Sequence, residues 1–154
     1  MRASALLLLT LVLLGCDALP QEDPPPPAAP EDPPADALEA ALRTRGEEVA
    51  DWMVRDGEPM RGTVAEGEAR DFSHVMLPGF CYKIVAVSGD GIEDLELRLY
   101  DGNSVLLQRD TTQDPRPFLG RERPVCPPET STYRLEVRAV SGGGEFAVHF
   151  YRSL

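Results

Sequence analysis

Apolar and polar residues alternate along most of the chain after residue 60. The alternation is strict at 95–100, 133–138 and 146–150, as expected of strands with one buried face. Weaker strand patterns occur at 62–65, 71–77, 80–87, 104–108 and 116–119. Turn residues separate these segments, so the pattern predicts an antiparallel β-sandwich or jelly roll of seven or eight strands over residues 58–154.

The same alternation predicts two details of the sandwich. In the strand near 80–87, we expect Tyr82, Ile84 and Ala86 to face the core. The last two strands are separated only by a glycine run, which predicts that they form a hairpin.

A helical period precedes the strands. Asp36 stands at an N-cap position with Glu39 three residues later, which is a capping-box spacing. Asp56-Gly57 with Pro59 then closes the segment, so the pattern predicts a helix over 36–57. Its apolar stripe could bind a partner, but we expect it to pack onto the adjoining domain. The stripe consists of Leu38, Leu42, Val49, Trp52 and Met53.

The first fifteen residues have the three parts of a secretory signal. Arg2 supplies the positive end, residues 5–14 are almost purely aliphatic, and Gly15 is small. The apolar run is shorter than the ~20 residues that a membrane-spanning helix needs. The junction Leu13-Leu14-Gly15-Cys16 resembles the bacterial lipobox, which implies cleavage before Cys16 and lipid on its sulfur. The alternative is an ordinary secretory signal followed by a chance cysteine.

Residues 16–35 connect this junction to the predicted helix. Prolines and acidic residues alternate in groups between Pro20 and Pro34. Such a composition favours extended polyproline II, at ~3.1 Å per residue, and predicts a spacer. A ligand for a proline-reading domain is the alternative.

Net charge narrows the set of partners. The chain carries a formal charge of −11, and such a chain repels nucleic acid and anionic lipid head groups. We therefore expect no nucleic-acid partner. The lipid would attach the protein to the membrane, and an envelope protein or polysaccharide would be its ligand.

Two cysteines remain after Cys16. Outside the cytosol, Cys81 and Cys126 are expected to form a disulfide. Two free thiols or a metal pair are the alternatives.

The segments around the strands carry a family resemblance. They are 62–68 with Asp71-Phe72, then Pro78-Gly79-Phe80-Cys81-Tyr82, then 94–103, 132–137 and Gly144-Glu145-Phe146. This succession is similar to the bacterial pre-peptidase C-terminal (PPC) β-sandwich, especially its cysteine-bridged form in predicted myxobacterial lipoproteins. The resemblance implies a non-catalytic accessory module in binding or stabilisation, although no enzyme accompanies the module in this chain.

Candidate catalytic residues are few. His149 alternates with two apolar neighbours and is expected to face solvent, while the register of His74 is open. No serine or cysteine nucleophile has a recognisable base nearby in the sequence. We therefore expect no enzymatic activity, with a small hydrolase assembled from distant residues as the alternative.

Two charged groups are candidate binding residues. Asp90, Glu93, Asp94 and Asp101 surround one strand and could supply oxygen ligands to Ca²⁺, as some PPC-type modules do. Solvated turn residues are the simpler interpretation, and no other cofactor is expected. Arg109, Arg116, Arg121 and Arg123 could bind a carboxylate or an anionic sugar. Pairing with the interleaved Asp110, Asp114 and Glu122 is the interpretation that we favour.

Together, the sequence predicts a lipid-anchored lipoprotein of the bacterial cell envelope, at the outer membrane or the periplasmic face. It would display a non-catalytic β-sandwich for protein or glycan binding, or for an envelope structural role. A calcium-dependent adhesion or accessory module is the alternative.

Overall fold

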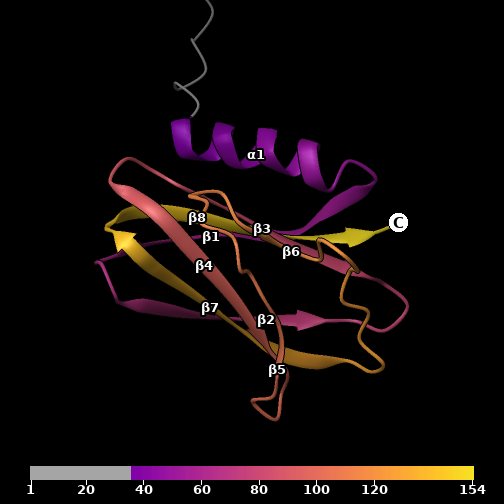
Figure 1. Ribbon diagram of the computed structural model, residues 1–154. Coiled ribbons are helices and arrows are strands. Elements are labelled where there is room, and N and C mark those ends of the chain that lie inside the picture. Colours follow the sequence, from indigo (N-terminus) through magenta and orange to yellow (C-terminus); the bar gives the residue numbers. More distant parts are fainter. Residues whose placement is uncertain (1–35) are drawn as a thin grey trace, which may run out of the picture. The chain divides into compact units, whose positions relative to one another are not determined.

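The structure, a computed structural model, describes residues 36–154. It is mainly β, with one helix followed by eight strands in two antiparallel sheets (Figure 1). The elements are α1 (Ala37–Val49), β1 (Met53–Val64), β2 (Ala69–Met76), β3 (Tyr82–Ser88), β4 (Ile92–Tyr100), β5 (Leu106–Arg109), β6 (Phe118–Leu119), β7 (Ser131–Gly142) and β8 (Gly144–Ser153). The predicted β-sandwich is confirmed. The predicted signal sequence, Cys16 and the predicted spacer 16–35 lie outside the described residues.

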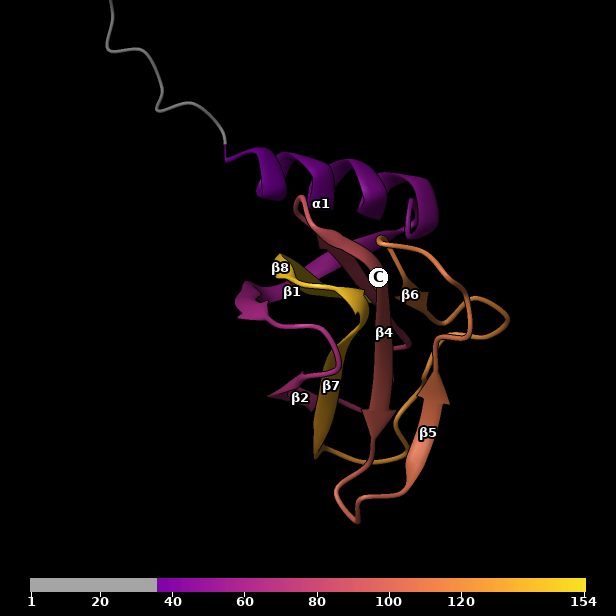
Figure 2. The ribbon, with the colours of Figure 1, turned by 60° about the vertical axis from the view of Figure 1, so that its left-hand side comes forward.

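Each sheet has four strands. Sheet A has the order β1-β8-β3-β6, and sheet B has the order β2-β7-β4-β5. The short edge strands β5 and β6 lie on the same side of the sandwich, because Gln108 of β5 hydrogen-bonds to Gly120 directly after β6. Figure 2 shows this side, with β5 at the rim of sheet B.

The main core lies between the two sheets. Alternate residues of β4 and β7 are fully buried, as the alternating pattern predicts. Sheet A contributes Tyr82, Ile84 and Ala86, so their predicted orientation is confirmed. The other large buried side chains of this core are Met76, Leu95, Leu97, Leu99, Leu119, Tyr133, Leu135, Phe146 and Phe150.

A second core forms where α1 packs on the outer face of sheet A (Figure 1). Asp36 caps the helix by accepting hydrogen bonds from the backbone N–H groups of Leu38 and Glu39. Leu42 is fully buried in this core. The expected packing of the helix onto the domain is therefore confirmed.

The helix is shorter than predicted. It ends at Val49, and residues 53–57, which were expected to be helical, belong to β1. The apolar residues Trp52 and Met53 continued the helical spacing, but Trp52 is 52 % exposed and Met53 opens the strand. The sandwich accordingly begins at residue 53 instead of 58.

Gly46 allows the close contact between helix and sheet. A Cβ atom at this position would overlap the ring and hydroxyl of Tyr151 on β8. Glycine lowers helix propensity by about 1 kcal/mol relative to alanine. Its presence in the last turn of α1 is explained by this packing.

The predicted hairpin between the last two strands is wrong. β7 belongs to sheet B, whereas β8 belongs to sheet A and pairs with β1 and β3. The chain changes sheets at Gly142 and Gly143. Gly142 has a φ of +76°, and a Cβ at Gly143 would lie 3.1 Å from the Ala65 Cα. The glycine run therefore forms a tight crossover between sheets.

Candidate functional site

Two cavities adjoin along β5, between this strand and the loop of residues 120–130 that connects β6 to β7. Their volumes are about 550 Å³ and 370 Å³. We call them the first and the second cavity. Leu107, Gln108 and Arg123 line both of them, so the two cavities adjoin, and together we call them the β5 groove. A cavity of this size and mixed polarity is typical of a ligand site.

The predicted disulfide holds one wall of this groove. Cys81 and Cys126 are bonded to one another, 45 residues apart in the sequence. Next to the disulfide, Tyr82 and Val125 exchange two backbone hydrogen bonds, of 2.7 and 2.9 Å. The 120–130 loop is thereby fixed to the first residue of β3.

A tight turn before β5 forms the end of the first cavity. The carboxylate of Asp101 accepts hydrogen bonds from the backbone N–H groups of Asn103 (2.9 Å) and Val105 (2.8 Å). This geometry is an Asx-type turn. Asp101 therefore shapes the groove, and one of its oxygens is already used by the backbone.

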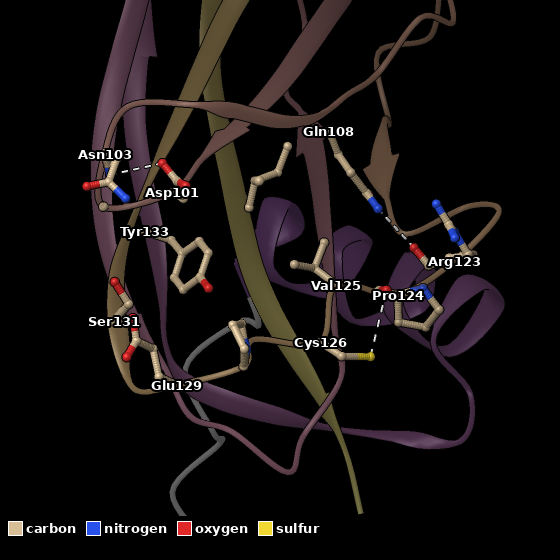
Figure 3. Close-up of a pocket in the computed structure, with 13 residues that line it drawn as sticks. Asp101, Asn103, Gln108, Arg123, Pro124, Val125, Cys126, Glu129, Ser131 and Tyr133 are labelled. Carbon is tan, nitrogen blue, oxygen red and sulfur yellow. Dashed lines mark hydrogen bonds between the residues drawn. The ribbon is translucent and has the colours of Figure 1, made fainter.

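Gln108 crosses the groove between the two cavities. Its side-chain oxygen accepts from the Gly120 N–H (2.9 Å), and its amide nitrogen donates to the Arg123 carbonyl oxygen (3.0 Å). Figure 3 shows the second of these bonds. One neutral side chain thus joins β5 to the opposite wall and separates the first cavity from the second.

The first cavity has an apolar wall and a hydroxyl at its base (Figure 3). Leu107 and Val125 supply apolar surface. The Tyr133 side chain is only 4 % exposed, and its hydroxyl points toward Val125 and Cys126. Because Tyr133 lines the cavity, its hydroxyl can reach a ligand there.

The environment of Tyr133 keeps it protonated. Burial raises the pKa of its phenol, and the nearby carboxylates Asp101 and Glu129 raise it further. The hydroxyl is therefore a hydrogen-bond donor at neutral pH. It can donate to a carbonyl or hydroxyl oxygen of a ligand.

The second cavity is lined by arginines. Arg109, Arg121 and Arg123 all contribute to its wall. Their residues are exposed, and the guanidinium of Arg121 lies 4.2 Å from the centre of the Phe118 ring. The structure therefore brings three of the four predicted arginines together. Arg116 is not part of this wall, and its carbonyl oxygen accepts a hydrogen bond from Arg45.

The ion pairs expected between these arginines and Asp110, Asp114 or Glu122 are not formed at contact distance, although the charge of Arg121 lowers the pKa of the Asp110 carboxyl group. None of the four forms an ion pair with any residue of 36–154. Asp114 lies 3.8 Å from Arg45 of the helix instead, and Asp110 accepts hydrogen bonds from Thr112. Alternation of charges in the sequence did not bring opposite charges into contact.

Asp110 is a buried acid in the wall of the second cavity. It is 4 % exposed, and burial raises the pKa of its carboxyl group despite hydrogen bonds from Thr112. Arg121 has the opposite effect on this pKa. The wall of the second cavity therefore combines three exposed guanidinium groups with the buried Asp110 and the exposed Glu122.

The four candidate calcium ligands do not form one site. Asp90 and Asp101 flank opposite ends of β4, while Asp94 lies within it. Within residues 36–154, no group of three histidine, cysteine or acidic side chains is arranged to hold a metal ion. Glu93 accepts a hydrogen bond from Ser141, and burial, together with neighbouring acids, raises the pKa of Asp94.

The prediction that His149 faces solvent is wrong. Its side chain points to the outer face of sheet A, which the segment around Gly57 covers, and only 2 % of it is exposed. Its Nε2 lies 2.9 Å from the Gly57 carbonyl oxygen. Burial lowers the pKa of His149, so the ring is neutral near pH 7.

His74 has a different environment between the edges of the two sheets. Its Nε2 lies 2.9 Å from the Asp56 carboxylate, which also pairs with Arg152. The ring stacks on Phe150 with a centroid distance of 4.0 Å. Neither histidine lines the β5 groove.

No pattern in the sequence predicted the first cavity. Its walls come from the turn after β4, from β5, from the 120–130 loop and from the start of β7. Only the arginines, which stand close together in the chain, gave a signal in advance. Gln108 and Tyr133 occupy ordinary strand positions and carried no pattern of their own.

Comparison of the sequence with protein-family models and with curated proteins finds no match. Over residues 36–154, no helix is both long and apolar enough to span a membrane.

Proposed function

We propose that the protein is a lipid-anchored, extracytoplasmic binding module that takes an anionic ligand in the β5 groove. The lipobox resemblance at Cys16 supports the anchor, and the composition of 16–35 supports a spacer. The observation that carries the binding role is the convergence of Arg109, Arg121 and Arg123 on one cavity.

Local charge favours an anionic ligand. The chain as a whole carries a charge of −11, yet three arginines that form no ion pair within residues 36–154 gather at one cavity, beside Asp110 and Glu122. Guanidinium groups bind carboxylates through paired, charge-assisted hydrogen bonds. A carboxylated polysaccharide or an acidic protein segment of the envelope is therefore the expected class of ligand.

Binding without catalysis is part of this proposal. Both histidines serve the architecture, since His74 links the sheet edges through Asp56 and His149 is buried beside Gly57. The groove holds a phenol, an amide, guanidinium groups and the carboxyl groups of Asp101, Asp110, Glu122 and Glu129, which suit recognition by hydrogen bonds.

Two measurements test the proposal. Mass spectrometry of the mature protein should find residues 1–15 removed and lipid on the Cys16 sulfur. An intact residue 1–15 segment or an unmodified thiol would contradict the anchor.

For binding, polygalacturonate and polyglutamate serve as probes with the full mature chain. The double variant Arg121→Gln/Arg123→Gln should lower affinity for whichever probe binds, by about tenfold for each lost charged contact. Arg43→Gln/Arg138→Gln is a matched control, because it removes the same charge from residues outside the groove. Equal weakening by the two double variants would contradict a specific site.

A further inference from the structure

The edge strand β1 contains a bulge that contacts both histidines of the chain. We propose that residues 57–59, which we call the β1 bulge, are held closed by neutral His149 and are released from sheet A when its imidazole accepts a proton. The fold would thereby contain a local, acid-operated switch at one sheet edge. This proposal does not depend on the binding role of the β5 groove.

The β1 bulge interrupts the pairing of β1 with β8. Asp56 pairs with Phe150 and Met60 pairs with Val148, so three residues of β1 stand opposite His149 alone. Gly57 has a φ of +77°, and both Gly57 and Glu58 are exposed. The bulge can therefore move while the regular pairs on both sides of it stay formed.

His149 closes the bulge from the outer face of sheet A. Its Nε2 lies 2.9 Å from the Gly57 carbonyl oxygen, which can only accept, so Nε2 carries the hydrogen of the neutral ring. Within residues 36–154, the buried Nδ1 has no hydrogen-bond partner. A proton added to Nδ1 would create a buried N–H group without an acceptor on a charged ring, which is costly. Protonation therefore favours a state in which this nitrogen reaches water.

Charged groups from two elements act on this imidazole. Arg55 of β1 lowers its pKa, whereas Glu58 of the bulge and Glu39 of α1 raise it, and the Tyr151 ring of β8 lies 5.4 Å from it between centroids. Glu39 is shared with the guanidinium groups of Arg55 and Arg61. Burial outweighs the two acids, and the pKa of His149 is lowered overall. The closed bulge therefore excludes the proton at neutral pH.

His74 fixes the base of the same bulge from the other sheet. Its Nε2 lies 2.9 Å from the Asp56 carboxylate, whose second oxygen lies 3.1 Å from Nε of Arg152. The His74 ring also stacks on Phe150, the partner of Asp56 in β8. A proton on His74 would strengthen its contact with the carboxylate. Acid should therefore free the residues after Asp56 while Asp56 itself stays in place.

Nuclear magnetic resonance of the full mature chain between pH 7 and pH 5 tests this switch. The ring nitrogens of His149 report its protonation, and backbone relaxation reports the order of the bulge. Order parameters of the Gly57 and Glu58 amides should fall from about 0.85, typical of rigid backbone, to below about 0.6. The midpoint of this fall should coincide with the protonation of His149, and the amides of Leu97 and Val137 in sheet B should stay rigid.

Two histidine variants separate the roles of the rings. His149→Gln keeps an N–H group that can donate to the Gly57 carbonyl oxygen but cannot accept a proton. Its bulge should stay ordered at both pH values. His74→Gln is the matched control, because it removes the other titrating ring, and its bulge should lose order in acid as the wild type does.

Two charge variants test whether protonation drives the change. Glu58→Gln removes a carboxylate that favours the charged imidazole, so the midpoint should move to lower pH. Arg55→Gln removes a like charge, so the midpoint should move to higher pH. Each shift should be about 0.2–0.7 pH unit, as expected of a partly screened charge.

Three results would overturn the proposal. One is protonation of His149 in the wild type while Gly57 and Glu58 stay ordered. Another is an equal loss of order in His149→Gln, and the third is a simultaneous loss of order in β4 and β7, which would mean unfolding of the whole domain. If His149→Gln does not fold, the wild-type titration and the opposite shifts of the two charge variants still decide the question.

Discussion

The two sheets bury their residues in different ways. In β4 and β7 of sheet B, buried and partly exposed residues alternate. In β3 and β8 of sheet A, most consecutive residues are buried. The difference arises because α1 covers the outer face of sheet A, whereas the outer face of sheet B carries solvated charged side chains. Sheet A is therefore covered on both faces, by sheet B on one side and by α1 on the other.

The largest effect should follow loss of the disulfide, which ties sheet A to the groove loop. The double variant Cys81→Ala/Cys126→Ala removes a cross-link that closes a 45-residue segment. Chain entropy predicts a loss of about 4 kcal/mol in the free energy of unfolding. Urea unfolding of the variant beside the wild type measures this loss. A change below about 1 kcal/mol would mean that the 120–130 loop is held mainly by its other contacts.

The second core provides the next test of the comparison. Leu42→Ala should lower the free energy of unfolding by about 3 kcal/mol, because a fully buried leucine is truncated. If the second core stabilises the protein as much as the main core does, the loss of unfolding free energy should equal that of Leu97→Ala in the main core. A cost near that of the exposed-face variant Ala41→Gly would show that α1 is dispensable.

His149 makes sheet A sensitive to pH. Because burial lowers its pKa, the unfolded chain binds a proton more readily than the folded protein does. Stability should therefore fall as the pH decreases below about 6.5, the usual pKa of histidine, and level off below the folded-state pKa. His149→Gln should remove this part of the pH dependence when melting temperatures are compared between pH 7 and 5. Subtraction of the two curves cancels the contributions of Asp94 and Asp110, whose pKa values are raised.

The smallest effect is expected on the exposed face of sheet B. Arg134 pairs with Asp71 at 2.7 Å, and both side chains are accessible to solvent. Asp71→Asn should cost only about 0.2–1 kcal/mol in urea unfolding, and less in high salt. A loss as large as that of Leu42→Ala would contradict the view that this face is a solvated layer.

The difference between the two sheets also explains which parts of the fold could be predicted from the sequence. Alternation located β4 and β7 clearly, because one face of sheet B is solvated. His149 was misplaced because the alternation rule assumes such a face, whereas sheet A has none at that position. The end of the helix was predicted too far along the chain, because Trp52 and Met53 fit the spacing of the helical stripe and also the beginning of a strand.

The glycine run shows another limit of local patterns. Two strands separated by glycines have the sequence of a hairpin, but tertiary pairing with β1 and β3 directs β8 to the other sheet. The arginines of the groove could be predicted because they are neighbours in the chain. Tyr133 and Gln108 could not, since their roles depend on segments that only the fold brings together.

The covalent bond between Cys81 and Cys126 also affects how the protein responds to cleavage by a protease. The ring that it closes includes β3 to β6 and the exposed turn before β5. A protease that cuts this turn would leave both fragments attached to each other, and the strands on either side would remain in their sheets. The nicked molecule would migrate as one species until a reducing agent separates its parts.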